Sequence, residues 1–171
     1  MSKQALIVID VQNLLVDHNP YRKEAYLKTL NEVIALFRAH QLPVLFIRHI
    51  SPDMQVGTEG FEVYRGLDVR EEDKKFNKTY RSMFMDTGLE AYLKVQGITR
   101  LTLCGMVAQN CVDASIKSAF ERGYELCIVK GGTSTFGDNI LSQEQIQAHY
   151  ENAWKYFGKV RSVEEIAKEL N

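Results

Sequence analysis

Four short runs of apolar residues divide the chain at fairly regular intervals. They are Ala5–Ile9, Val44–Ile47, Leu101–Cys104 and Leu126–Val129. Each run is continuous rather than alternating, which is typical of strands that are covered on both faces in a parallel sheet. A weaker fifth candidate lies at Tyr156–Val160.

Helical periodicity fills the stretches between these runs. Apolar residues recur with the 3.6-residue period over 26–37, over 89–97 and over 112–123, and the last two segments close on a glycine. Ser162 and Glu165 have the spacing of a capping box, which predicts a final helix. Because strands and helices alternate, we expect an α/β fold. It should hold a doubly wound, mostly parallel sheet with helices on both faces, within a single domain over 1–171. Ligands of such folds bind beyond the carboxyl ends of the strands.

Composition narrows the class of protein. The chain has 171 residues and a formal net charge of -1, which argues against a nucleic-acid partner because such proteins usually carry a basic face. Three cysteines are too few for a disulfide framework and favour a reducing compartment. No apolar run approaches the ~20 residues of a membrane span, and the first residues lack the pattern of a secretory signal. We therefore expect a cytoplasmic protein without a membrane partner.

Three residues follow predicted elements at places where chemistry is expected. Asp10 directly follows the first strand, Cys111 precedes the helix over 112–123, and Lys78 lies in a segment that we predict to be a loop. A helix N-terminus favours a thiolate. Each residue also has a structural interpretation: Asp10 as a turn or capping residue, Cys111 as an inert buried thiol, and Lys78 as a solvated surface group.

Together the three segments resemble the isochorismatase-like hydrolases. The resemblance rests on Ile7–Asn13 (IVIDVQN), on Lys78–Leu89 with its K-x-x-x-S-x-F pattern, on Gly105–Val112 (GMVAQNCV), and on the turn at Gly123. The match runs through nearly the whole chain in the right order. Three motifs at family-like spacing are far more specific than any one of them.

The resemblance implies a cysteine hydrolase that acts on a small molecule. In that family Asp10 would take the thiol proton of Cys111, Lys78 would hold charge between them, and the sulfur would attack a carbonyl to form a thioester. The backbone N–H groups of Cys111 and Val107 would form the oxyanion hole, after a cis peptide between Met106 and Val107. The family also implies a homodimer or homotetramer.

No cofactor is expected, and the pocket is less clear than the catalytic set. His49 and Asp53 do not make a convincing metal site, so we predict no catalytic metal. Ala108 and Lys130 depart from the family pattern in segments that border the pocket, which leaves the substrate open. The candidate substrate-binding residues are Val16, His18, His49, Tyr80, Phe84 and Phe136.

The most favoured function is hydrolysis of a C–N bond in a small amide or imide. An isochorismatase-type vinyl-ether hydrolase and a non-catalytic ligand-binding member of the fold are the alternatives. A redox function is disfavoured, because Cys111 has no Cys-x-x-Cys partner.

Overall fold

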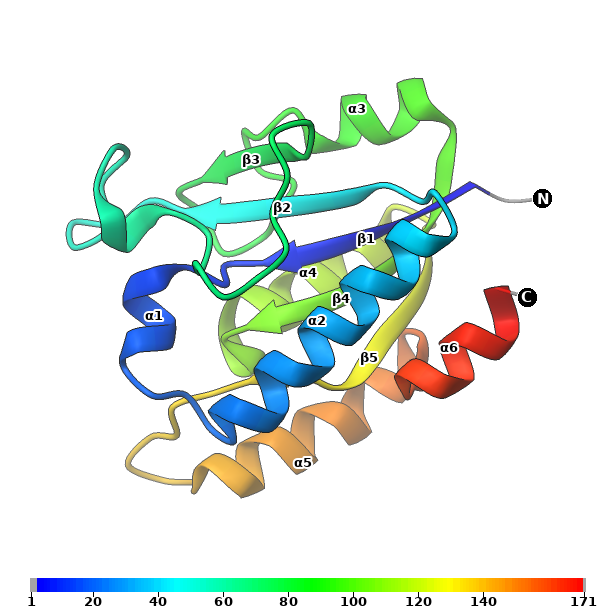
Figure 1. Ribbon diagram of the computed structural model, residues 1–171. Helices are drawn as coiled ribbons and strands as arrows, with labels where there is room; N and C mark the ends of the chain where they lie inside the picture. Colours follow the sequence, from blue (N-terminus) through cyan, green and yellow to red (C-terminus); the bar gives the residue numbers. More distant parts are fainter. Residues whose placement is uncertain (1–2, 171) are drawn as a thin grey trace.

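The computed structural model describes residues 3–170, which form a six-stranded parallel sheet between two layers of helices (Figure 1). The strands lie in the order β3-β2-β1-β4-β5-β6. Their bounds are β1 (Lys3–Ile9), β2 (Val44–His49), β3 (Lys74–Lys78), β4 (Ile98–Met106), β5 (Glu125–Ser134) and β6 (Lys159–Arg161). All five neighbouring pairs are parallel.

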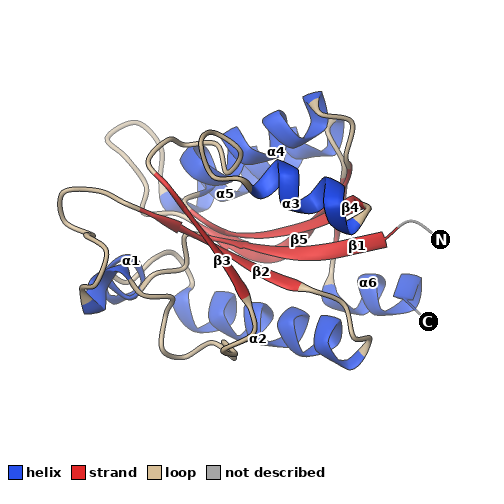
Figure 2. Cartoon of the chain, turned by 90° about the horizontal axis from the view of Figure 1, so that it is seen from above, coloured by secondary structure: helices blue, strands red, loops and turns tan. Residues whose placement is uncertain are grey.

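Helices cover both faces of the sheet, as the view from above shows (Figure 2). They are α1 (Asn13–Asp17), α2 (Lys23–Ala39), α3 (Leu89–Gln96), α4 (Asp113–Glu121), α5 (Gln143–Ala153) and α6 (Val163–Leu170). Short turns η1 (Glu59–Phe61), η2 (Ala108–Val112) and η3 (Trp154–Tyr156) join them. α2 and α6 pack on one face, and α3, α4 and η3 pack on the other.

The central strand β1 explains why the apolar runs are continuous. Ala5, Ile7 and Ile9 pack under α3 and α4, whereas Leu6 and Val8 pack under α2. All five side chains are at most 1% exposed. Since successive side chains of a strand point to opposite faces, a sheet covered on both sides needs apolar residues at every position.

The expected α/β class is confirmed, and the sheet is wholly parallel. The capping box at the start of α6 is present, with Ser162 and Glu165 exchanging two hydrogen bonds. Three elements were not expected: the short α1, the helix α5 and the edge strand β3. Lys78 therefore ends a strand rather than lying in a loop.

The switch in strand order falls between β1 and β4. The chain winds outward from β1 to β2 and β3, then crosses back to β4 and continues to β5 and β6. Gly105, near the end of β4, approaches β1 so closely that a Cβ there would clash with the carbonyl oxygen of Ile9. With φ of +129° this position requires glycine. The carboxyl ends of β1 and β4 are thus held together where ligands bind in such sheets.

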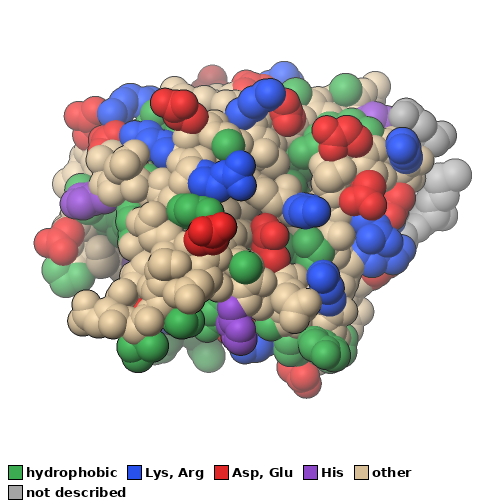
Figure 3. Space-filling model, turned by 90° about the horizontal axis from the view of Figure 1, so that it is seen from below, with side chains coloured by type: hydrophobic (Ala, Val, Ile, Leu, Met, Phe, Trp, Pro, Cys, Tyr) green, Lys and Arg blue, Asp and Glu red, His purple; other side chains and the backbone are tan. Residues whose placement is uncertain are grey.

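The surface carries charges of both signs. On the face seen in Figure 3, basic and acidic side chains are interspersed rather than gathered into one patch. Within residues 3–170, no helix is long and apolar enough to cross a membrane.

Candidate active site

The ammonium group of Lys78 is the centre of a buried polar cluster at the switch point. Its Nζ lies 2.7 Å from Oδ2 of Asp10, 3.2 Å from Sγ of Cys111 and 3.1 Å from Nδ1 of His49. The backbone carbonyl oxygen of Tyr80 is a further acceptor at 3.1 Å. The side chains of Lys78 and Asp10 are 0% and 1% exposed. The structure therefore brings together all three residues of the expected catalytic set, and adds His49.

Strand ends place each of these side chains. Asp10 follows β1, His49 ends β2, Lys78 ends β3, and Cys111 lies in η2 directly after β4. His49 and Lys78 are register partners across the β2–β3 pair, which sets their side chains next to each other. Asp10 has φ of +51°, a left-handed conformation that costs a non-glycine residue roughly 1–2 kcal/mol. Such strain is typical of functional sites.

Cys111 lies near a helix N-terminus, as expected. It is within the π-helical turn η2, two residues before the start of α4, and it is 5% exposed. Burial raises the pKa of its thiol to about 11, and the Asp10 carboxylate adds to this while Lys78 opposes it. Desolvation thus outweighs the favourable charge of Lys78, so the resting group is a thiol, which agrees with the expectation that Asp10 takes a proton from it.

The pKa values of Asp10 and His49 are also shifted, in opposite directions. Burial raises the pKa of Asp10, although the neighbouring Lys78 opposes the rise. Burial lowers the pKa of His49 to about 4, and the positive charges of Lys78 and Arg81 act in the same direction. At neutral pH His49 is therefore an uncharged imidazole.

Four hydrogen-bond acceptors surround Nζ of Lys78, which has only three protons to donate. An ammonium group carries three N–H donors, while His49, Tyr80, Cys111 and Asp10 offer it four acceptors. Small movements of one proton can therefore favour either the carboxylate or the sulfur without moving the cation.

Asp10, His49 and Cys111 also have the donor types of a metal site. Their ligand atoms lie within 4.8 Å of one another, and a carboxylate, an imidazole and a thiolate are the ligands that zinc prefers. Sequence reasoning considered His49 only with Asp53 and missed this set. The Lys78 ammonium contacts all three atoms, so a metal ion would have to displace it.

Gln12 and Asn13 hold the segment that follows β2 against the end of β1. Gln12 is 0% exposed; its amide donates to the carbonyl oxygens of His49 and Phe61, and its Oε1 accepts from the N–H of His49. Asn13 donates to the carbonyl oxygen of Glu59 and accepts from the N–H of Arg65. No role was expected for these two residues. The sequence does show that Gln12 and Asn13, two polar residues, closely follow Asp10 at the end of a buried strand, and this pattern could have indicated a structural role.

Replacing Gln12 with leucine should lower the free energy of unfolding by about 3 kcal/mol. The change leaves three backbone groups of His49 and Phe61 without their partner, and each such group costs about 1–3 kcal/mol when buried. Urea denaturation would measure the loss. The matched control is Gln55→Leu, since the exposed side chain of Gln55 makes one hydrogen bond, to the carbonyl oxygen of Ser51. Equal losses in the two variants would contradict this role for Gln12.

The segment after Lys78 is fixed to the helix that follows Cys111. The N–H of Met83 donates to Oγ of Ser115, and the hydroxyls of Ser82 and Ser118 are hydrogen bonded at 2.7 Å. These bonds connect the lysine segment directly to α4. They hold the segment that carries Lys78 against the helix that follows Cys111.

Of the six expected substrate-binding residues, His49 and Tyr80 contact the Lys78 ammonium, and the other four have other contacts. His49 and the carbonyl of Tyr80 contact Lys78, and Tyr80 as a whole is 53% exposed. Val16 is fully buried in α1, Phe84 stacks on Tyr124 in the core, and Phe136 packs against the core beneath α2. His18 ends α1, where its ring nitrogen contacts the carbonyl oxygen of Leu14.

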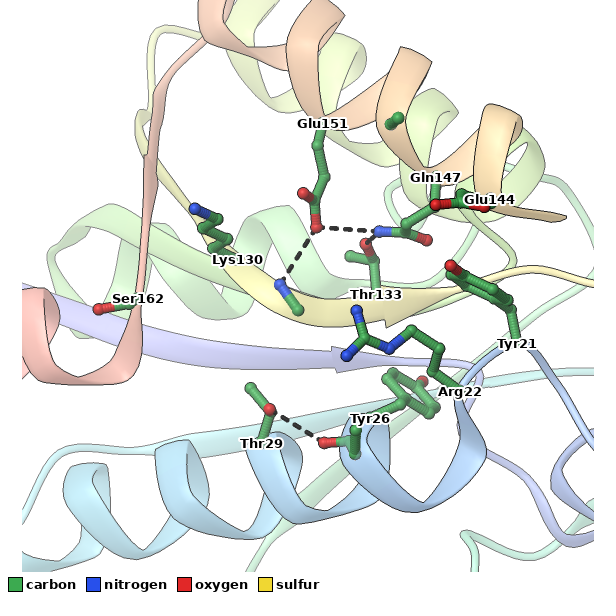
Figure 4. Close-up of a pocket in the computed structure, with 13 residues that line it drawn as sticks. Tyr21, Arg22, Tyr26, Thr29, Lys130, Thr133, Glu144, Gln147, Glu151 and Ser162 are labelled. Carbon is green, nitrogen blue, oxygen red and sulfur yellow. Dashed lines mark hydrogen bonds between the residues drawn. The ribbon is translucent and has the colours of Figure 1, made fainter.

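A separate groove of about 510 Å³ lies between α2 and α5, with β5 as its floor (Figure 4). Arg22 and Lys130 face Glu144 and Glu151 across it. Glu151 accepts from the N–H of Gly131 and from Gln147, so part of its polar lining is already paired. The groove does not include the Lys78 cluster.

The fold and the cluster define a class: a parallel α/β protein with an acid, an ammonium and a thiol at the switch point of the sheet. A family model for the isochorismatase domain matches residues 4–165. The chain belongs to the isochorismatase family of hydrolases.

Known proteins resemble the chain over most of its length. An uncharacterized isochorismatase family protein of Bacillus subtilis is 29% identical over 161 residues, covering 85% of this chain and 87% of that protein. A crystal structure of an isochorismatase family protein has a TM-score of 0.89 and 30% identity, covering 93% of this chain and 98% of that one. Streptothricin hydrolase of Streptomyces noursei is 28% identical over 139 residues, which cover 78% of this chain and 50% of that enzyme.

Proposed function

We propose that the chain hydrolyses a C–N bond of a small amide or imide through a thioester on Cys111. The observation that carries the proposal is the position of the Lys78 ammonium, 2.7 Å from the Asp10 carboxylate and 3.2 Å from the Cys111 sulfur. A base, a cation and a nucleophile within reach of one another are the parts that thiol-based acyl transfer needs. The similarity to streptothricin hydrolase supports a hydrolase of this general kind.

The first half of the reaction forms the thioester. Asp10 takes the proton of the Cys111 thiol, and the sulfur attacks the substrate carbonyl carbon. The backbone N–H groups of Val107 and Cys111 are the proposed donors to the resulting oxyanion. The C–N bond then breaks, and the proton on Asp10 passes to the leaving nitrogen.

The second half regenerates the enzyme. Asp10, again a carboxylate, takes a proton from water, and the hydroxide attacks the thioester carbonyl. The C–S bond breaks, the acid is released, and the sulfur recovers its proton. No cofactor takes part in these steps.

Electrostatics support this assignment of base and nucleophile. Proton transfer from sulfur to carboxylate moves one negative charge from one neighbour of Lys78 to another, so the buried cation stays paired throughout. The raised pKa of Asp10 makes it a stronger base than an exposed aspartate. The raised pKa of Cys111 keeps it protonated until substrate arrives.

A product assay tests the reaction class. The purified chain would be incubated with a panel of small amides and imides, with formation of the carboxylic acid product as the readout, and separately with isochorismate, with pyruvate as the readout. Formation of acid from an amide or imide alone supports C–N hydrolysis. Release of pyruvate alone would replace it with vinyl-ether cleavage, and a wholly negative panel would favour a ligand-binding function.

Thiol labelling gives a test that needs no substrate. Cys111 should react with iodoacetamide at least about tenfold faster than Cys104 or Cys127, because Asp10 can take its proton. Cys104 and Cys127 are 0% and 1% exposed, and burial raises the pKa of both. Peptide mass spectrometry of a time course would measure the three rates. Slow and equal labelling of all three thiols would contradict an activated nucleophile.

A further inference from the structure

The hydrogen bond between Lys78 and His49 determines which nitrogen of the imidazole carries the proton. Nδ1 of His49 lies 3.1 Å from Nζ of Lys78. An ammonium group can only donate, so a proton on Nδ1 would point at the cation, and the contact favours an unprotonated Nδ1. A neutral imidazole then carries its single proton on Nε2. His49 is partly exposed, so this N–H is a fixed donor at the margin of the buried cluster.

Arg81 is a second hydrogen-bond donor on the segment beside the cluster. It is exposed and directly follows Tyr80, whose carbonyl oxygen contacts Lys78. Its charge acts on both Asp10 and His49. Seven of the nine arginines make ion pairs within residues 3–170, and Arg81 and Arg22 are the two that do not.

We propose that the substrate carries an anionic group, a carboxylate near its scissile carbonyl, which is bound by Nε2–H of His49 and the guanidinium of Arg81. Lys78 is already neutralised by Asp10, so Arg81 leaves this site with a net charge of one positive unit. A neutral N–H donor beside an unpaired guanidinium is suited to a carboxylate, which accepts hydrogen bonds and carries the opposite charge. The inference rests on the proposed cysteine chemistry and specifies its substrate class.

Two alkylating reagents of nearly equal size test the preference for an anion. Iodoacetate and iodoacetamide both alkylate Cys111 by the same reaction: the sulfur bonds to the methylene carbon, iodide leaves, and Asp10 takes the thiol proton. Only iodoacetate carries a carboxylate. The measured quantity is the rate with iodoacetate divided by the rate with iodoacetamide. A variant that only changes the reactivity of the thiol alters both rates equally and leaves this ratio unchanged. We expect this ratio to be higher at Cys111 than for free glutathione in the same buffer.

Three variants locate the effect. His49→Asn keeps an acceptor for Lys78 but removes the Nε2 donor, and should lower the ratio about tenfold, as for a hydrogen bond to a charged group. Arg81→Gln should lower it about threefold, because an exposed ion pair contributes less, and added salt should reduce that difference. Arg22→Gln is the matched control. Arg22 is also exposed and unpaired but lines the separate groove, and its replacement should leave the ratio unchanged.

The possible outcomes distinguish failure of the anion site from failure of the proposed cysteine chemistry. Fast labelling of Cys111 by both reagents, with a ratio that neither His49→Asn nor Arg81→Gln lowers, would overturn the anion site and leave the nucleophile intact. Labelling of Cys111 no faster than of Cys104 would overturn the proposed function itself. A ratio lowered equally by Arg22→Gln would indicate a general surface charge effect and would also overturn the site.

Nuclear magnetic resonance provides an independent measurement on the resting protein. With 15N-labelled histidine, long-range proton–nitrogen correlations distinguish a protonated from an unprotonated ring nitrogen. His49 should show an unprotonated Nδ1 and a protonated Nε2 at pH 7, assigned by loss of its signals in His49→Asn. A proton on Nδ1 would contradict the proposed donor.

Discussion

Replacement of Cys111 by alanine is expected to lower the rate of amide hydrolysis by about 10⁴-fold or more. The proposed mechanism has no other nucleophile: Cys104 and Cys127 are buried inside strands, and the remaining members of the cluster are a base, a cation and a hydrogen-bond donor. Loss of the nucleophile in a comparable acyl-transfer site removes nearly all of the acceleration, and residual activity comes from binding and the oxyanion donors. The measurement is the initial rate of acid formation from whichever amide the wild-type chain cleaves.

The appropriate control is Cys127→Ala, which removes a sulfur of similar size from the core. It should leave the rate within about twofold, since Cys127 lies in β5 away from the Lys78 cluster, and it should lower stability by about 1 kcal/mol. A Cys111→Ala variant that retained the wild-type rate with unchanged denaturation would rule out a thioester. Attack by activated water, as in an ether-cleaving reaction, would then be the better explanation.

The central strands could be predicted because their physical signal is strong. β1, β2, β4 and the first half of β5 are buried on both faces, so their composition is set by burial alone and no partner need be known. β3 gave no such signal. It is an edge strand of sequence KKFNK, and only its last residue is buried. α5 buries only Ile146 fully, although its capping box at Ser142 and Gln145 was visible in the sequence.

Because β3 was not predicted, the contact between His49 and Lys78 could not be predicted either. Asp10, Lys78 and Cys111 were identified from motif resemblance, which gives identity and order but no distances. His49 contacts Lys78 because the two are register partners between β2 and β3, and register cannot be inferred for a strand that is not recognised. The raised pKa of Cys111 was also out of reach, because the desolvation that causes it depends on packing.

Removing either member of the Asp10–Lys78 pair is expected to lower the free energy of unfolding by about 3–5 kcal/mol. Both side chains are essentially inaccessible to water, so Asp10→Asn leaves a buried ammonium, and Lys78→Met a buried carboxylate, without its counter-charge. The double variant Asp10→Asn with Lys78→Met should lose much less than the sum of the two single losses. The coupling energy from urea denaturation of all four proteins measures the interaction directly. Additive losses would mean that the two groups are not paired in the folded protein.

The two single variants should also differ in their dependence on pH. In Lys78→Met the cation that lowers the Asp10 pKa is gone, so burial raises that pKa further above the unfolded value of 3.8. A folded-state pKa above the unfolded value means that the folded chain binds more protons in between, so stability is retained at low pH and is lost as pH rises. The deficit of Lys78→Met relative to wild type should therefore grow as the pH rises above the unfolded pKa of 3.8. Asp10→Asn has no carboxyl at this position, whereas the raised Asp10 pKa makes wild type lose stability as pH rises, so the deficit of Asp10→Asn relative to wild type should shrink over the same range. If the deficit of Lys78→Met instead shrank with rising pH, the carboxyl of Asp10 would have to be hydrated in the folded chain, and it could not act as the strengthened base on which the proposed reaction depends.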